Sequence, residues 1–334
     1  EDGRKTLWFF DPGKVPAYSP HIWTMLAVVA FVLTALTLLW LNARPDFAIL
    51  RDKSKGKSKL YSFLAAGWVG STHQWGALRD RVSVLGIFYF MLLITVNYFL
   101  ASDFLMAMIP GWVDSLYPAT QTHNAIQGGV AILTISVFIM WKWGGYRDFI
   151  GLDQLWGLGK LLFGISLLWF WFFISSLMVL WYGKKPNERD VLQILMFGNY
   201  LPIFVSTFFF VCIIPFFCLT LDKIRKSFYG PPIIALSVLI GNFLDRLRHY
   251  GSAYSLDRTM NEATHRFANL PEIAIPNIVD LMVIFGAVSL PIFLILLITK
   301  YVPAISIWEN REYLLYGSHE KYYKTEVLVE GKPY

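Results

Sequence analysis

Residues Trp23–Trp40 read WTMLAVVAFVLTALTLLW, a run of 18 residues without a charged side chain. An α-helix needs about 20 residues to cross the hydrocarbon core of a bilayer, so this run is close to the required length. The whole chain of 334 residues is 56% hydrophobic and 17% aromatic, an apolar share above that of typical soluble domains. Since the backbone of a membrane span must satisfy its hydrogen bonds within the segment, the sequence predicts an all-α, polytopic transmembrane helix bundle.

About seven helices are expected, flanked by two less apolar segments. The predicted spans lie near residues 23–40, 82–108, 125–143, 158–181, 192–221, 231–250 and 278–301. The sixth is the weakest prediction, because its apolar part ends at Asp245, Arg246 and Arg248. These charges require snorkelling or a protein-lined exit. Residues 1–22 form a predicted outer segment, and residues 302–334 form a predicted cytoplasmic tail.

The distribution of basic residues predicts the orientation. Counting on alternate sides of the seven spans places 18 lysines and arginines on one side and 10 on the other. Cytoplasmic loops carry the excess, so Glu1 is expected on the outer side and the carboxyl terminus in the cytoplasm. The net charge of +6 lies in loop flanks and forms no basic domain, which argues for lipid headgroups as partners and against nucleic acid.

The sequence predicts no metal or cofactor bound by this chain itself. Its two cysteines, Cys212 and Cys218, are too few for an iron–sulfur cluster. No pair of cysteines or histidines has the spacing of zinc ligands. A haem held by two histidines would need His123 and His249 to face each other, and this remains an open alternative.

Ionisable side chains near the ends of the spans are candidates for a proton route, because such groups are costly in a membrane unless they pair or function. The outer candidates are Asp103, His123, Asp245, Arg246 and Asp280, and the inner candidates are Lys160, Asp222 and Lys300. Asp103 and His123 flank one short turn and are expected to form the outer exit. The alternative is structural: interfacial caps, ion pairs or a salt-linked latch.

Three strings resemble one family of membrane subunits. They are FLASDFLMAMIPGW at Phe99–Trp112, FWFFISSLMVLWYG at Phe170–Gly183 and PFFCLTLDKIRK at Pro215–Lys226. Together they resemble the ActF family, the NrfD-like integral membrane subunits of bacterial alternative complex III. The chain departs from the family pattern at Met106–Pro110, where a family glutamate before the proline is replaced by Ile109.

The resemblance implies a subunit of a quinol:electron-acceptor oxidoreductase in the bacterial inner membrane, within a respiratory or photosynthetic chain. It implies menaquinol as electron donor, with iron–sulfur clusters and haem c in partner subunits and an ActC-like sister subunit holding the quinol site. This chain would be a scaffold and a possible proton route, not catalytic alone. About three helices are expected to precede Glu1. A secondary transporter or channel, and an inert anchor, remain alternatives.

Overall fold

The computed structural model has an all-α architecture, as predicted. It describes residues 20–53, 58–109, 112–183, 185–256, 260–261, 266–267, 272–273, 275–316, 319–323 and 325–328. Within these residues six helices are long and apolar enough to cross a membrane, which makes this a multi-pass membrane protein. Residues 1–19 of the predicted outer segment, and residues 317–318, 324 and 329–334 of the predicted tail, lie outside the described residues.

The described chain divides into two compact units. The first contains the start of α1 up to Val28 and Leu92–Ile275, and the second contains Val29–Met91 and the described residues after Pro276. Helices α1 (Pro20–Lys53) and α3 (Thr72–Phe104) therefore contribute to both units.

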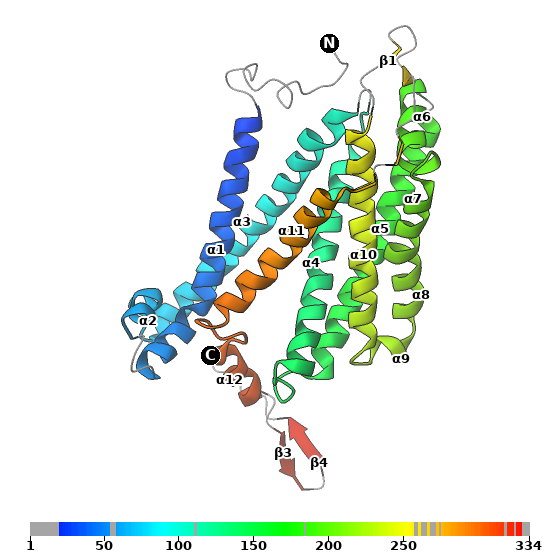
Figure 1. The fold of residues 1–334 in the computed structure, drawn as a ribbon. Helices are drawn as coiled ribbons and strands as arrows, with labels where there is room; N and C mark the ends of the chain where they lie inside the picture. Colours follow the sequence, from blue (N-terminus) through cyan, green and yellow to red (C-terminus); the bar gives the residue numbers. More distant parts are fainter. Residues whose placement is uncertain are drawn as a thin grey trace. The chain divides into compact units, whose positions relative to one another are not determined.

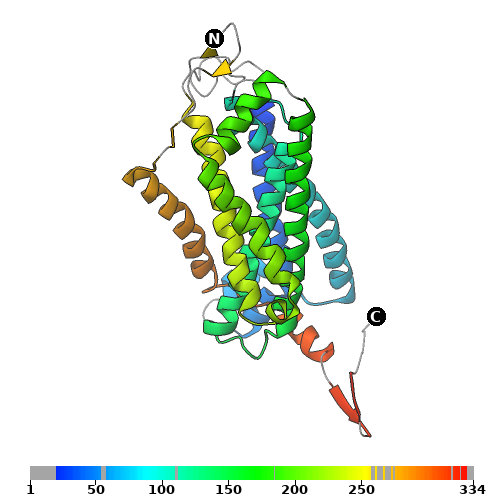
Figure 2. The same ribbon diagram turned by 90° about the vertical axis from the view of Figure 1, so that its right-hand side faces the viewer.

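The first unit is a helix bundle. After α3 come η2 (Met106–Met108), α4 (Leu116–Trp143) and α5 (Leu152–Gly183). The remaining helical elements are α6 (Pro186–Leu192), η3 (Gln193–Phe197), α7 (Leu201–Phe208), η4 (Phe209–Ile213), α8 (Ile214–Thr220), α9 (Asp222–Arg225) and α10 (Gly230–Tyr254). The two residue pairs β1 (Met260–Asn261) and β2 (Arg266–Phe267) form a short antiparallel ribbon. In Figures 1 and 2, α4, α5, α7, α8 and α10 run side by side, and α10 contacts each of the others.

Helix α10 occupies the predicted sixth span, and its environment explains its charges. Its 25 residues exceed the length required to cross a bilayer, but its composition excludes it from the six strongly apolar helices of the described residues. Asp245, Arg248 and His249 are all buried in the bundle. A helix surrounded by other helices can carry polar groups on a protein-facing side, because partner side chains replace water there. Asp245 and Arg248 are therefore protein-lined, one of the two exits that the sequence allowed, whereas Arg246 is exposed.

The predicted span 192–221 is not one continuous α-helix. It consists of α7 and α8 joined by a π-helical turn, η4, and it is preceded by a second π-helical turn, η3. The helix ends at Gly198 and restarts at Leu201, followed by Pro202 in its first turn. Proline is favourable there, since the first-turn N–H groups have no partner in the helix.

The second unit has a core at the Lys53 end of α1. Its elements are the remainder of α1 and α3, with α2 (Ser58–Ala65), α11 (Ile278–Ile298) and α12 (Ile307–Tyr316). A hairpin of β3 (His319–Tyr322) and β4 (Thr325–Leu328) follows. Buried residues of this core are Leu41, Phe47, Ala48, Tyr61, Ala65, Trp68 and Leu78.

Helix α12 is held by specific contacts with this core. The Asp46 carboxylate accepts hydrogen bonds from the backbone N–H groups of Ile307 and Trp308, at 3.0 and 3.1 Å, which satisfies donors in the first turn of α12. The Trp308 indole packs against Trp75 and donates to the Asn42 carbonyl oxygen. The described start of the predicted tail is thus an ordered helix.

Candidate functional site

The most strongly buried set of ionisable groups lies near the carboxyl end of α10. Asp245, Arg248 and His249 are spaced three and four residues apart, so they share one helix face. This face is directed into the bundle, where the three residues are 2%, 4% and 6% exposed. Groups buried to this extent require hydrogen-bond partners or opposite charges.

Asp245 has such partners on two helices. One carboxylate oxygen, Oδ1, accepts from Arg248 Nη2 at 2.6 Å. The other, Oδ2, accepts from Asn124 Nδ2 at 3.0 Å and from Gln121 Nε2 at 3.5 Å, and both of these side chains come from α4. The carboxylate is thus neutralised by a guanidinium and oriented by two amides, an arrangement that stabilises its ionised form.

The His249 ring is held in one tautomer by its neighbours. Nδ1 lies 2.7 Å from the Asp245 carbonyl oxygen, which can only accept, so Nδ1 must carry a proton. Nε2 lies 3.4 Å from Arg248 Nη2, which can only donate, so a neutral Nε2 fits this contact. The Tyr117 ring lies 5.0 Å from the imidazole, and Trp112 stacks parallel to it at 6.4 Å.

Arg248 connects this cluster to the π-helical turn η3. Its Nη1 donates to the carbonyl oxygen of Leu195, two residues before that turn ends, and its guanidinium lies 5.2 Å from the centre of the Phe204 ring. Carbonyl groups in the last turn of a helix have no partner within it. The interruption of the helix after η3 therefore creates the acceptor that Arg248 uses.

Further polar side chains extend from this cluster along the α4–α10 contact. Gln127 Nε2 donates to Ser166 Oγ on α5 at 3.1 Å, and Asn242 lies beside Gly128. Buried atoms without a hydrogen-bond partner among the described residues include Asn124 Oδ1, Gln127 Oε1, both side-chain polar atoms of Asn242 and Thr207 Oγ1. Buried polar atoms are almost always hydrogen-bonded in folded proteins, which favours ordered water at these positions.

An apolar layer follows the last of these polar groups. It consists of the buried residues Ala131, Leu162, Leu219, Ile234, Ala235 and Val238. Gln127 and Ala131 are one turn apart on α4, and Asn242 and Val238 are one turn apart on α10. The row of polar groups therefore reaches from the Asp245 cluster to this layer.

The structure does not form the predicted Asp103–His123 pair. Asp103 Oδ2 instead accepts from Thr24 Oγ1 at 2.9 Å and lies 3.4 Å from His21 Nδ1, both on α1. His123 is buried, with its ring 5.5 Å from Phe172 of α5 and no partner for Nε2 among the described residues. The predicted pairing of Asp103 with His123 is therefore wrong: Asp103 contacts α1, whereas His123 contacts α5.

The other two outer candidates have separate positions. Arg246 is exposed and does not pair with Asp245, whose partner is Arg248. Asp280 accepts from the Asn277 N–H at 2.8 Å and completes a capping box at the start of α11. This is the structural role that the sequence allowed for Asp280.

One inner candidate, Lys160, and a partner of another, Lys226, lie close to one aromatic ring. The Lys160 ammonium lies 3.2 Å from the centre of the Trp156 ring, and Lys226 lies 5.5 Å from it. Asp222 accepts from Lys226 Nζ at 3.0 Å and from Arg225, and these bonds and charges lower the pKa of its carboxyl. Lys300 is exposed just after α11, in the second unit.

The predicted proton-route residues did not include four members of this network: Gln121, Asn124, Arg248 and His249, the last of which was considered only as a possible haem ligand. A signal was present, because the polar residues at positions 121, 124 and 127 follow helical spacing, as do those at positions 242, 245, 249 and 252. Within the described chain, no group of three or more histidine, cysteine, aspartate or glutamate residues could hold a metal ion.

No protein-family model matches the chain, and no curated protein is significantly similar to it in sequence. The fold and the site together define the class of the protein: it is a multi-pass helical membrane protein with a buried Asp–Arg–His network.

Proposed function

We propose that this chain is an NrfD-like membrane subunit of a quinol-oxidising electron-transfer complex of the alternative complex III type. In this proposal it holds no redox centre and supplies a scaffold and part of a proton route. The observation that carries the proton route is the buried Asp245 network, with its row of polar groups leading to Gln127 and Asn242. The assignment to the complex is supported by the three strings at Phe99–Trp112, Phe170–Gly183 and Pro215–Lys226.

The network has the chemistry of one half of such a route. Asp245, Asn124 and Gln127 offer acceptors and donors on adjacent turns, and water bound to their unpartnered atoms would join them. A proton entering from the Asp245 end could reach the centre of the bundle. The apolar layer around Ala131 and Val238 would stop it there unless a neighbouring subunit or a change in packing continues the path.

The proposed function also implies partner subunits, a membrane and an orientation. Partners would be an ActC-like sister subunit, iron–sulfur and c-type cytochrome subunits and membrane lipids. Menaquinol, iron–sulfur clusters and haem c would be bound by those partners, in a bacterial inner membrane. The Asp245 end would face outward and the carboxyl terminus the cytoplasm, in line with the distribution of basic residues.

A secondary transporter is the second candidate, and one observation favours it. A π-helical turn, η4, separates α7 from α8. The helix is also interrupted between the end of η3 and the start of α7. Transporters bind substrates at discontinuous helices, and π-helical turns are frequent at functional sites. Against it, Arg248 already occupies the carbonyl group that the break exposes.

The test is purification of the chain under gentle detergent conditions, followed by proton counting. We expect a multi-subunit complex with c-type haem absorption, whereas a colourless protein that moves a solute would favour the transporter. In the complex, Asp245→Asn should lower the number of protons released per quinol oxidised. Asp103→Asn, the same chemical change at the other candidate, should leave this ratio unchanged. Gln127→Leu provides a second test without loss of charge, and unchanged ratios in both Asp245→Asn and Gln127→Leu would contradict the proton route.

A further inference from the structure

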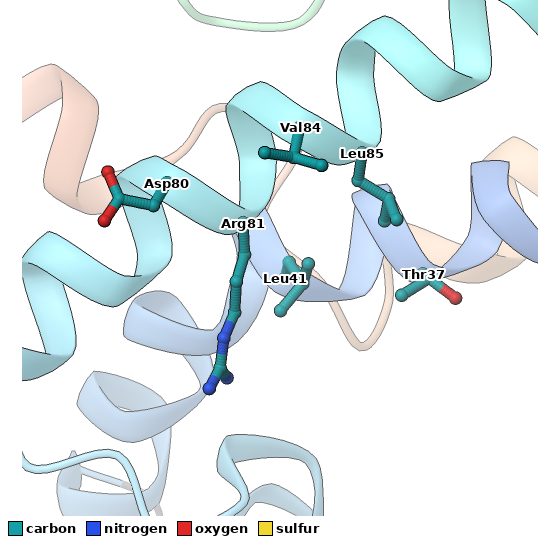
Figure 3. Close-up of a pocket in the computed structure, with 6 residues that line it drawn as sticks. All are labelled: Thr37, Leu41, Asp80, Arg81, Val84 and Leu85. Atoms are coloured by element: carbon teal, nitrogen blue, oxygen red, sulfur yellow. The ribbon is translucent and has the colours of Figure 1, made fainter.

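A groove between α1 and α3 in the second unit has features of a lipid site. It is lined by Thr37, Leu41, Asp80, Arg81, Val84 and Leu85 and has a cavity volume of about 470 Å³ (Figure 3). This volume lies within the range of roughly 300–1,000 Å³ found for small-molecule sites.

The walls of the groove are apolar over most of its length. Leu41, Val84 and Leu85 present aliphatic side chains. The Thr37 hydroxyl donates to the Leu33 carbonyl oxygen of its own helix at 2.7 Å, so its polar group is already satisfied. A hydrocarbon chain would fit these walls. The only polar side chain that α1 contributes, Thr37, already has its hydrogen-bond partner and loses nothing when the chain covers it.

One end of the groove is positively charged. The Arg81 side chain extends from α3 on the side of Leu41, whereas the Asp80 carboxylate points away from it (Figure 3). Arg81 is exposed and forms no ion pair among the described residues. Arg44 is close enough to repel it electrostatically, and Arg44 itself donates to the carbonyl oxygens of Ala65 and Ala66. Two guanidinium groups near each other attract an anion, and the Asp80 carboxylate, which also lines the groove, points away from the Leu41 side.

The exposed Trp40 ring favours a position of this end at the depth of lipid headgroups, whereas Trp68 is buried in the core of the second unit. The Arg44 guanidinium lies 5.2 Å from the Trp40 ring and 5.3 Å from the Trp68 ring. Tryptophan is enriched at membrane–water interfaces, where its ring lies at the level of the headgroups. We propose that the groove binds one anionic glycerophospholipid, with its phosphate at Arg81 and one acyl chain between α1 and α3. This site is independent of the proposed function.

The proposal is tested with the full chain in nanodiscs containing equal parts of phosphatidylglycerol and phosphatidylcholine. Native mass spectrometry counts the lipids that stay bound when the protein is released. Wild type should retain phosphatidylglycerol in preference to phosphatidylcholine. Arg81→Gln should weaken phosphatidylglycerol binding about fivefold, the effect of one basic residue near the membrane surface. The matched control is Arg79→Gln, since Arg79 is exposed on the same helix and does not line the groove.

A second pair of variants tests the groove itself. Val84→Trp should fill it and reduce the retained lipid, whereas Phe90→Trp, on a different face of α3, should not. Size-exclusion chromatography checks that each variant is folded. Equal losses in Arg81→Gln and Arg79→Gln would overturn the proposal. So would unchanged retention in Val84→Trp, or wild-type binding without preference between the two lipids.

Discussion

Helices α10 and α11 have similar lengths, 25 and 21 residues, but opposite environments. Helix α10 has thirteen buried residues, among them Asp245, Arg248 and His249, whereas α11 has no buried residue among those described. Helix α11 is apolar on all sides, as expected of a helix that faces lipid. The polarity of a span follows its surroundings: α10 is polar where other helices supply partners, whereas α11 has no buried residue and no polar face, as a lipid-facing helix requires.

The largest expected effect is the loss of one partner from the α10 network. Arg248→Met leaves the Asp245 carboxylate buried without its guanidinium, which should destabilise the protein by about 3–5 kcal/mol. The free energy of unfolding is measured in mild detergent by adding increasing amounts of dodecyl sulfate and recording the loss of helix by circular dichroism. The matched control is Arg246→Met, an exposed arginine on the same helix, which should change the stability by less than about 0.5 kcal/mol. Similar effects of the two variants would show that burial does not distinguish them.

A smaller effect is expected when α11 receives a charge. Val288 lies at the middle of α11 and is exposed, so Val288→Asp should cost about 2.5–3.5 kcal/mol of apparent membrane-insertion free energy. Insertion is measured in microsomes, with an engineered glycosylation site after the helix. Val288→Ile is the control and should insert like wild type. Efficient insertion of Val288→Asp would mean that the centre of α11 does not face lipid.

The third comparison uses one glycine from each helix. A Cβ atom at Gly241 of α10 would lie 2.4 Å from Val211 Cγ2 and 3.1 Å from the Val211 backbone nitrogen. Because backbone atoms of η4 must then shift, Gly241→Ala should destabilise the protein by about 1–3 kcal/mol. At Gly286 of α11 a Cβ atom meets no heavy atom within 4 Å. Gly286→Ala should therefore cause no loss of stability in the same detergent unfolding assay, and a loss as large as that of Gly241→Ala would contradict the close packing of α10.

Much of the fold could be predicted from the apolar runs. The predicted span 278–301 and the helix Ile278–Ile298 agree closely, because α11 is limited at one end by its capping box and contains no charged residue after Asp280. Other helices extend beyond their predicted spans. Helix α4 begins at Leu116, nine residues before 125, since its first turns carry polar residues that pack inside the bundle. Apolar runs therefore predict the bounds of a helix well when its residues are exposed, as in α11, and less well when its ends carry polar residues packed inside the bundle, as in α4.

The candidate site was less predictable. Sequence reasoning named Asp245 and Arg246 as outer candidates but not Arg248, the partner of Asp245, and it expected Asp103 beside His123 instead of His21 and Thr24. Asp103 and His123 were expected together because they flank one short turn, but a shared turn does not decide which helix each side chain faces. On a helix, neighbours in sequence point about 100° apart, so a partner three or four residues away, or on another helix, is better placed.

By itself the sequence determined that this is an all-α, multi-pass membrane protein, because long runs without charge must leave water and can satisfy their backbone only as helices. Which polar groups meet depends on how the helices pack against one another. The Asp245 carboxylate binds Asn124, 121 positions earlier in the chain, and Arg248 binds the carbonyl group of Leu195 at a helix break. Helical periodicity fixes which residues share a face, but the packing of one helix against another selects the partner for that face.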